Sequence, residues 1–353
     1  MQDCIRNIRI FGQPHVYQTS KLEKMAQLDN PFGVFVSNGE VFIADTLNQR
    51  VRKLLRNGQI VTIAGNGSMG YDGDGQLATD AQLDFPAQVV VSSSDQVYIS
   101  SGNSIRKIDR NGMMSTIAGT GEAGYNGDDQ LAIHAKMSPC GLFVTEDEEI
   151  LIVDNDNHRI RKIDRNGMIT TIAGNGIKGF NGDGQLATTA QLSHPVSVFQ
   201  YKNEIYISDF GNHRIRKIDT SGIISTIAGP DIITNPDAIF VHNDEVYFLQ
   251  CKRLCKLQCN GIMKTLSESE VLNCPNGIFV DNDSHIYIAD TFNHCIRRID
   301  QDGVSSIVGT MGEQGYSGDV PFDFKQYPHI GPRKKSKIKP FPKVYHDLIV
   351  ICD

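Results

Sequence analysis

The chain has 353 residues, of which 40% are hydrophobic and 21% are charged, with 33 glycines, 13 prolines and no tryptophan. This balance excludes a disordered chain, and no apolar run approaches the roughly 18 residues that a transmembrane helix needs. The net charge of −7 argues against broad binding of nucleic acid through its phosphates. Short apolar runs separated by glycine and proline are typical of many short strands joined by tight turns.

The chain divides into three predicted regions. Residues 1–24 are expected to form an N-terminal strand and a linker, and residues 7–12 have the pattern of a strand that recurs later. Residues 25–309 contain the repeated units of the main domain. Residues 310–353 are expected to be a divergent basic tail or the start of a further unit, since five of the seven residues in 333–339 are basic.

A segment that alternates apolar and basic residues recurs six times, at intervals of 54, 55, 55, 39 and 42 residues. An apolar run precedes each copy, and most copies are followed by Asn-Gly or Asp-Gly and a strand that ends in Ile-Ala-Gly. Each unit therefore reads as four antiparallel strands, with glycine supplying the positive φ of a tight hairpin between the third and the fourth. The copies begin at Val51, Ile105, Ile160, Ile215, Leu254 and Ile296.

Six such units predict an all-β fold, a six-bladed β-propeller of four-stranded antiparallel blades. Radial closure leaves few sheet edges exposed, which suits units that each expose two edges when alone. The alternative is a propeller of seven blades with a partial terminal blade, in which residues 347–351 pair with residues 7–12. We expect the propeller to be monomeric.

The units resemble NHL repeats in their long variant, which reads I-A-G-x-G-x-x-G-[YF]-x-G-D-G. The first copy begins with Ile63-Ala64-Gly65, continues through Tyr71-Asp72-Gly73-Asp74-Gly75 and ends at Pro86. The resemblance covers about residues 25–319. It implies a propeller that serves as a binding platform for protein or RNA, as a sensor or occasionally as an enzyme. Function has to be inferred from individual residues, because one fold serves many functions.

A second motif, D-x-x-N-[HQ]-R, lies between the second and third strands of four units. We expect Asp and Asn to bond the backbone of this turn, and His and Arg to bridge to the next blade. The alternative is a ring of acid–base or metal-binding groups. His158, His213 and His294 belong to different blades, however, and would be too far apart to bind one zinc ion. The predicted structural residues are Asp45, Asn48, Asp154, Asn157, Asp209, Asn212, Asp290 and Asn293.

The Asp72-Gly73-Asp74-Gly75 segment of the first long insert resembles part of a calcium-binding loop, although the second copy reads Gly127-Asp128-Asp129. An EF-hand needs a further oxygen ligand two residues on and a Glu at position 12, whereas Gln76 and Leu77 follow here. We therefore predict no metal and no cofactor, with calcium at these loops as the alternative. A glycine-rich turn and a short helical stretch over Ala78–Leu83 are expected instead.

The units differ most at the fifth and sixth blades. The long insert is missing before both, so tall loops are expected over blades two to four and a low sector over blades five and six. After the proline of the first strand, near the channel mouth, blades one to four have an apolar residue, whereas blades five and six have Asp237 and Asn276. These two are the candidate binding residues. The alternative is a pair of solvated turn residues.

We expect a non-enzymatic interaction module, a scaffold that binds a protein partner through its loop-bearing face. The sequence offers no defensible Ser/His/Asp or Cys/His arrangement. The alternatives are a propeller enzyme of the lactonase or lyase type with a channel metal, and an RNA-binding NHL propeller. The eight cysteines contain no CxxC pair, which predicts reduced thiols and a cytoplasmic protein. An extracellular location is the alternative if the chain is part of a secreted protein.

Overall fold

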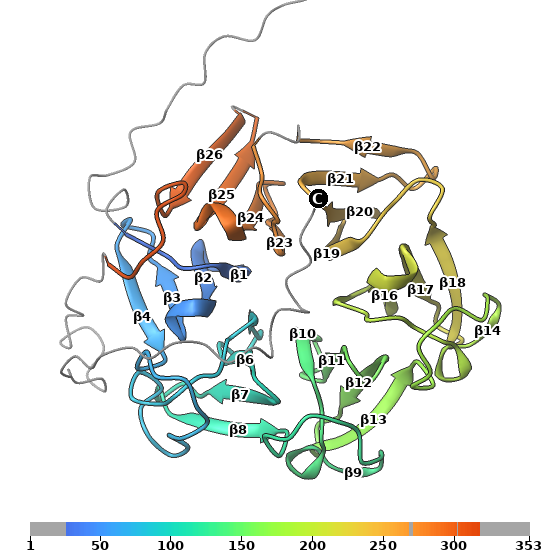
Figure 1. The fold of residues 1–353 in the computed structure, drawn as a ribbon, viewed down its shortest axis with the longest axis horizontal. Coiled ribbons are helices and arrows are strands. Elements are labelled where there is room, and N and C mark those ends of the chain that lie inside the picture. Colours follow the sequence, from blue (N-terminus) through green and yellow to red (C-terminus); the bar gives the residue numbers. More distant parts are fainter. Residues whose placement is uncertain (1–25, 268–270, 302, 318–353) are drawn as a thin grey trace, which may run out of the picture.

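The computed structural model describes residues 26–267, 271–301 and 303–317. These residues form six antiparallel sheets arranged as blades around a central axis (Figure 1), so the predicted six-bladed propeller is confirmed. The alternative of seven blades does not match the described residues, which build six. Three predicted segments lie outside the described residues: the strand at 7–12, the basic run at 333–339 and the strand at 347–351.

Each blade has four main strands, which we name a to d from the axis to the rim (Figure 1). Blades 1 and 2 contain β1 (Pro31–Ser37), β2 (Glu40–Asp45), β3 (Arg50–Leu54) and β4 (Ile60–Ala64), then β5 (Gln88–Val91), β6 (Val97–Ser101), β7 (Ser104–Ile108) and β8 (Met114–Ala118). Blades 3 and 4 contain β10 (Pro139–Val144), β11 (Ile150–Asp154), β12 (Arg159–Ile163) and β13 (Met168–Ala173), then β15 (Ser197–Tyr201), β16 (Glu204–Asp209), β17 (Arg214–Ile218) and β18 (Ile223–Ala228). Blades 5 and 6 contain β19 (Pro236–His242), β20 (Glu245–Gln250), β21 (Arg253–Leu257) and β22 (Met263–Thr265), then β23 (Gly277–Val280), β24 (Ile286–Asp290), β25 (Cys295–Asp300) and β26 (Gly303–Val308).

Blades 3 and 4 carry a fifth strand at the rim, where β9 (Gln130–Leu131) pairs with β13 and β14 (Gln185–Leu186) pairs with β18. Short 3-10 helices complete the described elements: η2 (Thr46–Asn48), η3 (Ala132–His134), η4 (Ala187–Thr189), η5 (Phe210–Asn212) and η6 (Thr291–Asn293). Within the described part of the chain, no helix is long and apolar enough to span a membrane. The six cysteines described there carry free thiols.

Local sequence explains the two hairpins of each blade. The turn between strands c and d closes at a glycine with positive φ, such as Gly58 at 82°, a conformation that glycine adopts without strain. In blades 1, 4 and 6 the turn between strands b and c is a 3-10 turn that ends in a left-handed residue, such as Gln49 in blade 1 and His213 in blade 4. Antiparallel pairing then places all b–c turns, and the start and end of every d-to-a connection, on one face of the ring, which we call the insert face. Between these ends the long connections pass over the rim to the c–d turn of the next blade.

Apolar clusters between neighbouring blades form the core. At the junction of blades 1 and 2, Ala44 packs with Val89 and Ile99, and the connection between the blades adds Ala78 and Leu83. Each blade thus buries its two faces against its neighbours, as the short apolar strands require.

The predicted helical stretch over Ala78–Leu83 is wrong. These residues form turns and bends, and the equivalent residues of the next two inserts form the single 3-10 turns η3 and η4. The physical reason is that the N–H of Gln82 bonds to the carbonyl oxygen of Asp72, whereas a helix would bond it to that of Ala78, which instead accepts from the N–H of Gly65.

The ring closes without exchanging a strand between blades, because every blade consists of one continuous stretch of chain. At the closing junction, Val34 and Ile43 of blade 1 pack with Ala289 and Ile296 of blade 6. The described segment after β26 lies on blade 1, where Ser317 forms a bridge with Gln27.

Candidate functional site: the insert face and the channel mouth

The aspartates of the D-x-x-N-[HQ]-R turns are fully buried and anchor the backbone of their own blade. In each case Oδ1 accepts a hydrogen bond from an N–H just before the strand-a proline, two positions before it in blades 1, 4 and 6 and one position before it in blade 3. The four bonds are Asp29 N–Asp45 Oδ1 (2.8 Å), Ser138 N–Asp154 Oδ1 (2.7 Å), Ser193 N–Asp209 Oδ1 (2.7 Å) and Asn273 N–Asp290 Oδ1 (2.7 Å). Blades 2 and 5 lack the aspartate, yet Ser101 Oγ and Gln250 Oε1 accept the same bond.

The asparagines of the motif connect the turn to the preceding loop. Each Nδ2 donates to the aspartate three residues earlier and to a backbone carbonyl of the d-to-a connection. The carbonyl bonds are Asn48–Gly315 (2.6 Å), Asn157–Gly124 (2.8 Å), Asn212–Gly179 (2.7 Å) and Asn293–Val271 (3.2 Å).

The histidine or glutamine of the motif bridges to the next blade, where it accepts a hydrogen bond from the N–H preceding the strand-a proline. The bonds are Phe85 N–Gln49 Oε1 (2.7 Å), His194 N–His158 Nδ1 (3.2 Å), Asn235 N–His213 Nδ1 (3.1 Å) and Asn30 N–His294 Nδ1 (3.2 Å). An accepting Nδ1 carries no proton, so each histidine serves this contact in its neutral form. Burial, reinforced by His194 and Lys178, lowers the pKa of His158 accordingly.

The arginines of strand c hold the long inserts. The first, half-buried arginine stacks on the aromatic residue of an insert, with guanidinium-to-ring distances of 3.8 Å for Arg159 over Tyr125 and for Arg214 over Phe180. The second arginine is fully buried and pairs with the insert aspartate. These pairs are Arg106–Asp74 (3.0 Å), Arg161–Asp128 (3.0 Å) and Arg216–Asp183 (2.9 Å).

Calcium would have to compete with these contacts. Asp74 also accepts bonds from the N–H and the hydroxyl of Thr116, so both of its carboxylate oxygens are engaged. Asp183 likewise accepts from Thr226 as well as from Arg216. The oxygen atoms that a calcium ion would need therefore already have donors.

The inserts pass over the rim to the c–d turn of the next blade instead of rising around the channel. Their aromatic and acidic residues contact strand c, and β9 and β14 pair outside strand d. The expected tall loops over blades 2–4 are thus a cover on the outer strands. The sequence did not predict that the inserts pair with the outer strands, because a strand of two residues has almost no recognisable sequence pattern.

The residues that follow the strand-a proline surround the channel mouth on this face, and all are half-buried. They are Phe32, Ala87, Cys140, Val196, Asp237 and Asn276. Asn276 donates from Nδ2 to Cys274 O (3.0 Å) and to Thr291 Oγ1 (2.8 Å), so its amide is bound within blade 6. Asp237 accepts a bond from the N–H of Ala238, and burial raises the pKa of its carboxyl to about 7.

A collar of phenylalanines lies deeper in the channel and was not predicted. Five blades place Phe at the fourth position after the strand-a proline, and blade 2 has Val90 there. Ring centroids of neighbouring blades lie 4.4–5.0 Å apart where two phenylalanines adjoin. The regular spacing of these residues in the repeats was the available signal. The collar consists of Phe35, Phe143, Phe199, Phe240 and Phe279.

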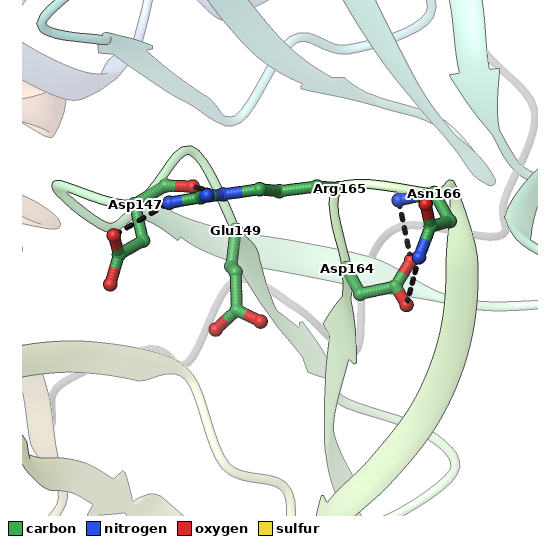
Figure 2. A pocket seen from close by; sticks show the side chains of 5 residues that line it. All are labelled: Asp147, Glu149, Asp164, Arg165 and Asn166. Carbon is green, nitrogen blue, oxygen red and sulfur yellow. Dashed lines mark hydrogen bonds and ion pairs between the residues drawn. The ribbon is translucent and has the colours of Figure 1, made fainter.

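The opposite face has a surface hollow of about 470 Å³ on blade 3 (Figure 2). Figure 2 shows that its charged groups already have partners: Arg165 donates to Asp147 at 2.6 Å, and Asp164 accepts from the N–H of Asn166 at 2.8 Å. Glu149, which also lines it, accepts from Lys162 at 2.9 Å. The hollow is open to solvent and its charged groups already have partners, so a ligand would find no unpaired charge to bind.

Comparison with known proteins agrees with this architecture. Residues 272–299 match the family model of the NHL repeat, and residues 69–125 match that of the teneurin NHL domain. Together with the six blades, these matches bear out the resemblance to NHL repeats.

The similar proteins include teneurins. The chain is 28% identical to teneurin-3 of Danio rerio over 221 residues, which are 54% of this chain and 8% of that protein. It is 30% identical to teneurin-m of Drosophila melanogaster over 187 residues, 47% of this chain and 7% of that protein. The match therefore spans less than a tenth of the length of these relatives.

Two solved structures show the same fold. A streptogramin B lyase aligns with a TM-score of 0.56 at 16% identity, covering 82% of this chain and 87% of the lyase chain. A chain of a nidogen–laminin complex aligns with a TM-score of 0.54 at 14% identity, covering 74% and 88% of the two chains. At these identities the likeness concerns the fold alone.

Proposed function

We propose that this propeller is a non-enzymatic interaction module that binds a protein partner through its insert face. One observation supports the proposal: the exposed large apolar side chains gather in the d-to-a connections, which start and end on this face and, in the long inserts, pass over the rim between these ends. Of the fourteen such side chains in the described residues, twelve belong to these connections. Exposed apolar side chains that cluster in this way are typical of surfaces that bind another protein.

Four of these side chains recur near the start of different connections. We call them the apolar rim residues: Met69, Ile177, Ile232 and Met311, with exposed fractions of 50%, 60%, 45% and 62%. Each belongs to a different junction between blades, so they are spread around the ring. A partner that covers the face would bury several of them at once, and burial of each would contribute about 1–2 kcal/mol.

The alternatives have weaker support. The repeated charged groups of the insert face are engaged in internal hydrogen bonds and ion pairs, which favours binding through apolar contacts over acid–base chemistry. The likeness to a lyase is one of fold, and the net charge of −7 disfavours RNA as the partner.

Affinity capture with immobilised propeller tests the proposal. We expect the double variant Met69→Ser/Ile177→Ser to lose a protein that the unmodified propeller retains. The matched control is Ile262→Ser/Val304→Ser, which removes two exposed apolar side chains outside the connections. A partner that the control loses and the first variant keeps would contradict the proposed face.

Two measurements on the purified protein distinguish the alternatives. One divalent ion per chain that withstands dialysis, together with loss of that ion on Asp237→Asn, would favour a channel enzyme. Salt-sensitive retention of RNA on a filter at physiological salt would favour the nucleic-acid class.

A further inference from the structure

The channel mouth on the insert face combines one carboxylate with largely apolar walls. Asp237 and Cys140 face the same space from blades 5 and 3: burial raises the pKa of the Cys140 thiol, and the Asp237 carboxylate raises it further. Cys140 Sγ lies 3.6 Å from the carbonyl oxygen of Val196, whose blade lies between the two. Phe32 and Ala87 complete the apolar part of the mouth.

Asp237 differs from the buried aspartates of the turn motif, because each of those has an arginine nearby. The pairs are Asp45–Arg52 (3.2 Å), Asp154–Arg161 (3.6 Å), Asp209–Arg216 (3.4 Å) and Asp290–Arg297 (2.8 Å). Across the described ranges, no basic side chain forms a salt bridge with Asp237. Protein encloses its carboxyl on nearly all sides, yet the residue keeps solvent contact in the channel. A carboxylate in this setting favours a cation delivered from outside.

Neighbouring blades are in close contact around the mouth. A Cβ on Gly277 would lie 2.5 Å from the carbonyl oxygen of Phe32, and a Cβ on Gly141 would lie 2.7 Å from that of Val196. The carboxyl of Asp237 already accepts a bond from the N–H of Ala238, so it suits the point charge of an ammonium group better than the two parallel bonds of a guanidinium.

We infer that the channel mouth binds a lysine-type ammonium side chain of the protein partner, with Asp237 as its counter-ion. The inference rests on the proposed function, since the partner on the insert face carries this side chain. The ammonium group pairs with the Asp237 carboxylate, and the aliphatic stem packs against Phe32, Ala87 and Val196. The phenylalanine collar begins about 10 Å deeper, three residues along the strand, and offers no competing polar group.

Protonation of Asp237 competes with the cation, because a neutral carboxyl offers it no charge. With a pKa of about 7, roughly a tenth of the carboxyl is ionised at pH 6 and nine tenths at pH 8. Ammonium binding should thus strengthen about tenfold over this range. Cys140, the titratable group that shares the mouth, stays protonated throughout. The titratable side chains on the strands packed against β19 have partners of their own. On β15 and β16, Tyr201 contacts Lys202, Glu204 bonds to Tyr206 and Lys217, and Asp209 pairs with Arg216. On β20, Glu245 bonds to Tyr247 and Lys256.

The test uses the whole chain labelled with ¹³C at alanine methyls, with Ala87 and Ala238 as reporters of the mouth. The probes are N-acetyl-lysine methylamide and its uncharged counterpart N-acetyl-norleucine methylamide. We expect the lysine probe to shift both methyl signals and the norleucine probe to leave them unchanged. Asp237→Asn should weaken the lysine probe at least tenfold at pH 8, as loss of a charge-assisted bond predicts. Asp283→Asn, which removes an exposed carboxylate on the opposite face, is the matched control.

Equal shifts from both probes, or unchanged lysine binding in Asp237→Asn, would overturn the inference. So would stronger binding at pH 6 than at pH 8. These results are separate from the test of the proposed function. Capture that depends on the apolar rim residues, without binding of the lysine probe, would refute this inference alone. Binding of the lysine probe, with capture that ignores those residues, would refute the proposed face instead.

Discussion

Thr291 of blade 6 donates a hydrogen bond from Oγ1 to the carbonyl oxygen of Pro31 in blade 1, at 2.8 Å. The same contact joins other neighbours, from Thr46 to Pro86 (2.8 Å) and from Asn155 to Pro195 (2.7 Å). The junction that closes the ring therefore uses the chemistry of the internal junctions. Closure needs no exchanged strand because this bond and the shared apolar cluster already bind the last blade to the first.

Thr291→Val should destabilise the fold, because it leaves the buried Pro31 carbonyl without this donor. We expect a loss of about 1–3 kcal/mol in the free energy of unfolding by urea. Thr46→Val removes the equivalent bond between blades 1 and 2 and should cost a similar amount. A large effect of Thr46→Val beside no effect of Thr291→Val would mean that the closing junction is held in another way.

Asp154→Ala should lower stability by about 1–3 kcal/mol, because it leaves the Ser138 N–H without its acceptor and removes one of the two carboxylates beside the buried Arg161. The melting temperature and urea midpoint report this loss. Asp237→Asn should leave the melting temperature at pH 6 almost unchanged, since the carboxyl is mostly protonated there. An equal loss of stability from both substitutions would refute the division between a structural and a binding aspartate.

The stability of the unliganded protein should depend on pH through Asp237. Its folded pKa of about 7 exceeds the ordinary value of 3.8, so the unfolded chain loses this proton first as the pH rises. Stability therefore falls between about pH 4 and pH 7 by on the order of 2 kcal/mol, reduced from the full linkage by solvent contact. Asp237→Asn should remove this part of the fall, so the variant is more stable than the parent at pH 8. Parallel pH profiles of the two proteins would contradict this assignment.

Calcium should have little effect on stability. Because Asp74, Asp128 and Asp183 pair with buried arginines, we expect millimolar calcium and a chelator to give the same melting temperature. Differential scanning calorimetry measures this directly. A calcium-dependent rise that disappears in Asp183→Asn would place an ion at these loops after all.

The repeats made the blade architecture predictable, because a residue that recurs at one offset makes one recurring contact. The Asp and Asn of the b–c turn illustrate this: Asp45 and Asn48 bond the same backbone groups as their equivalents in other blades. Where another residue replaces the motif aspartate, the repeated sequence pattern does not reveal that the same hydrogen bond is made. Ser101 and Gln250 preserve the aspartate's bond with different chemistry, which only the backbone position reveals.

The candidate binding residues could be found in the sequence because they differ from the equivalent residues of the other blades, but the sequence did not show which of them is free to bind. Asp237 and Asn276 both stand out as polar against apolar equivalents, and the sequence treats them alike. The structure separates them, since Thr291 lies within reach of the Asn276 amide, whereas the described residues provide no basic side chain for Asp237. That difference depends on the three-dimensional path of the b–c turn in blade 6.

The phenylalanine collar forms an apolar ring inside the channel. Five half-buried phenylalanines and Val90 line one level of it, and none of these side chains carries a group that could pass a proton to Asp237. Polar access to that carboxyl is therefore from the insert face. A partner seated on that face would cover this access, so we expect proton exchange at Asp237 to slow while the complex lasts.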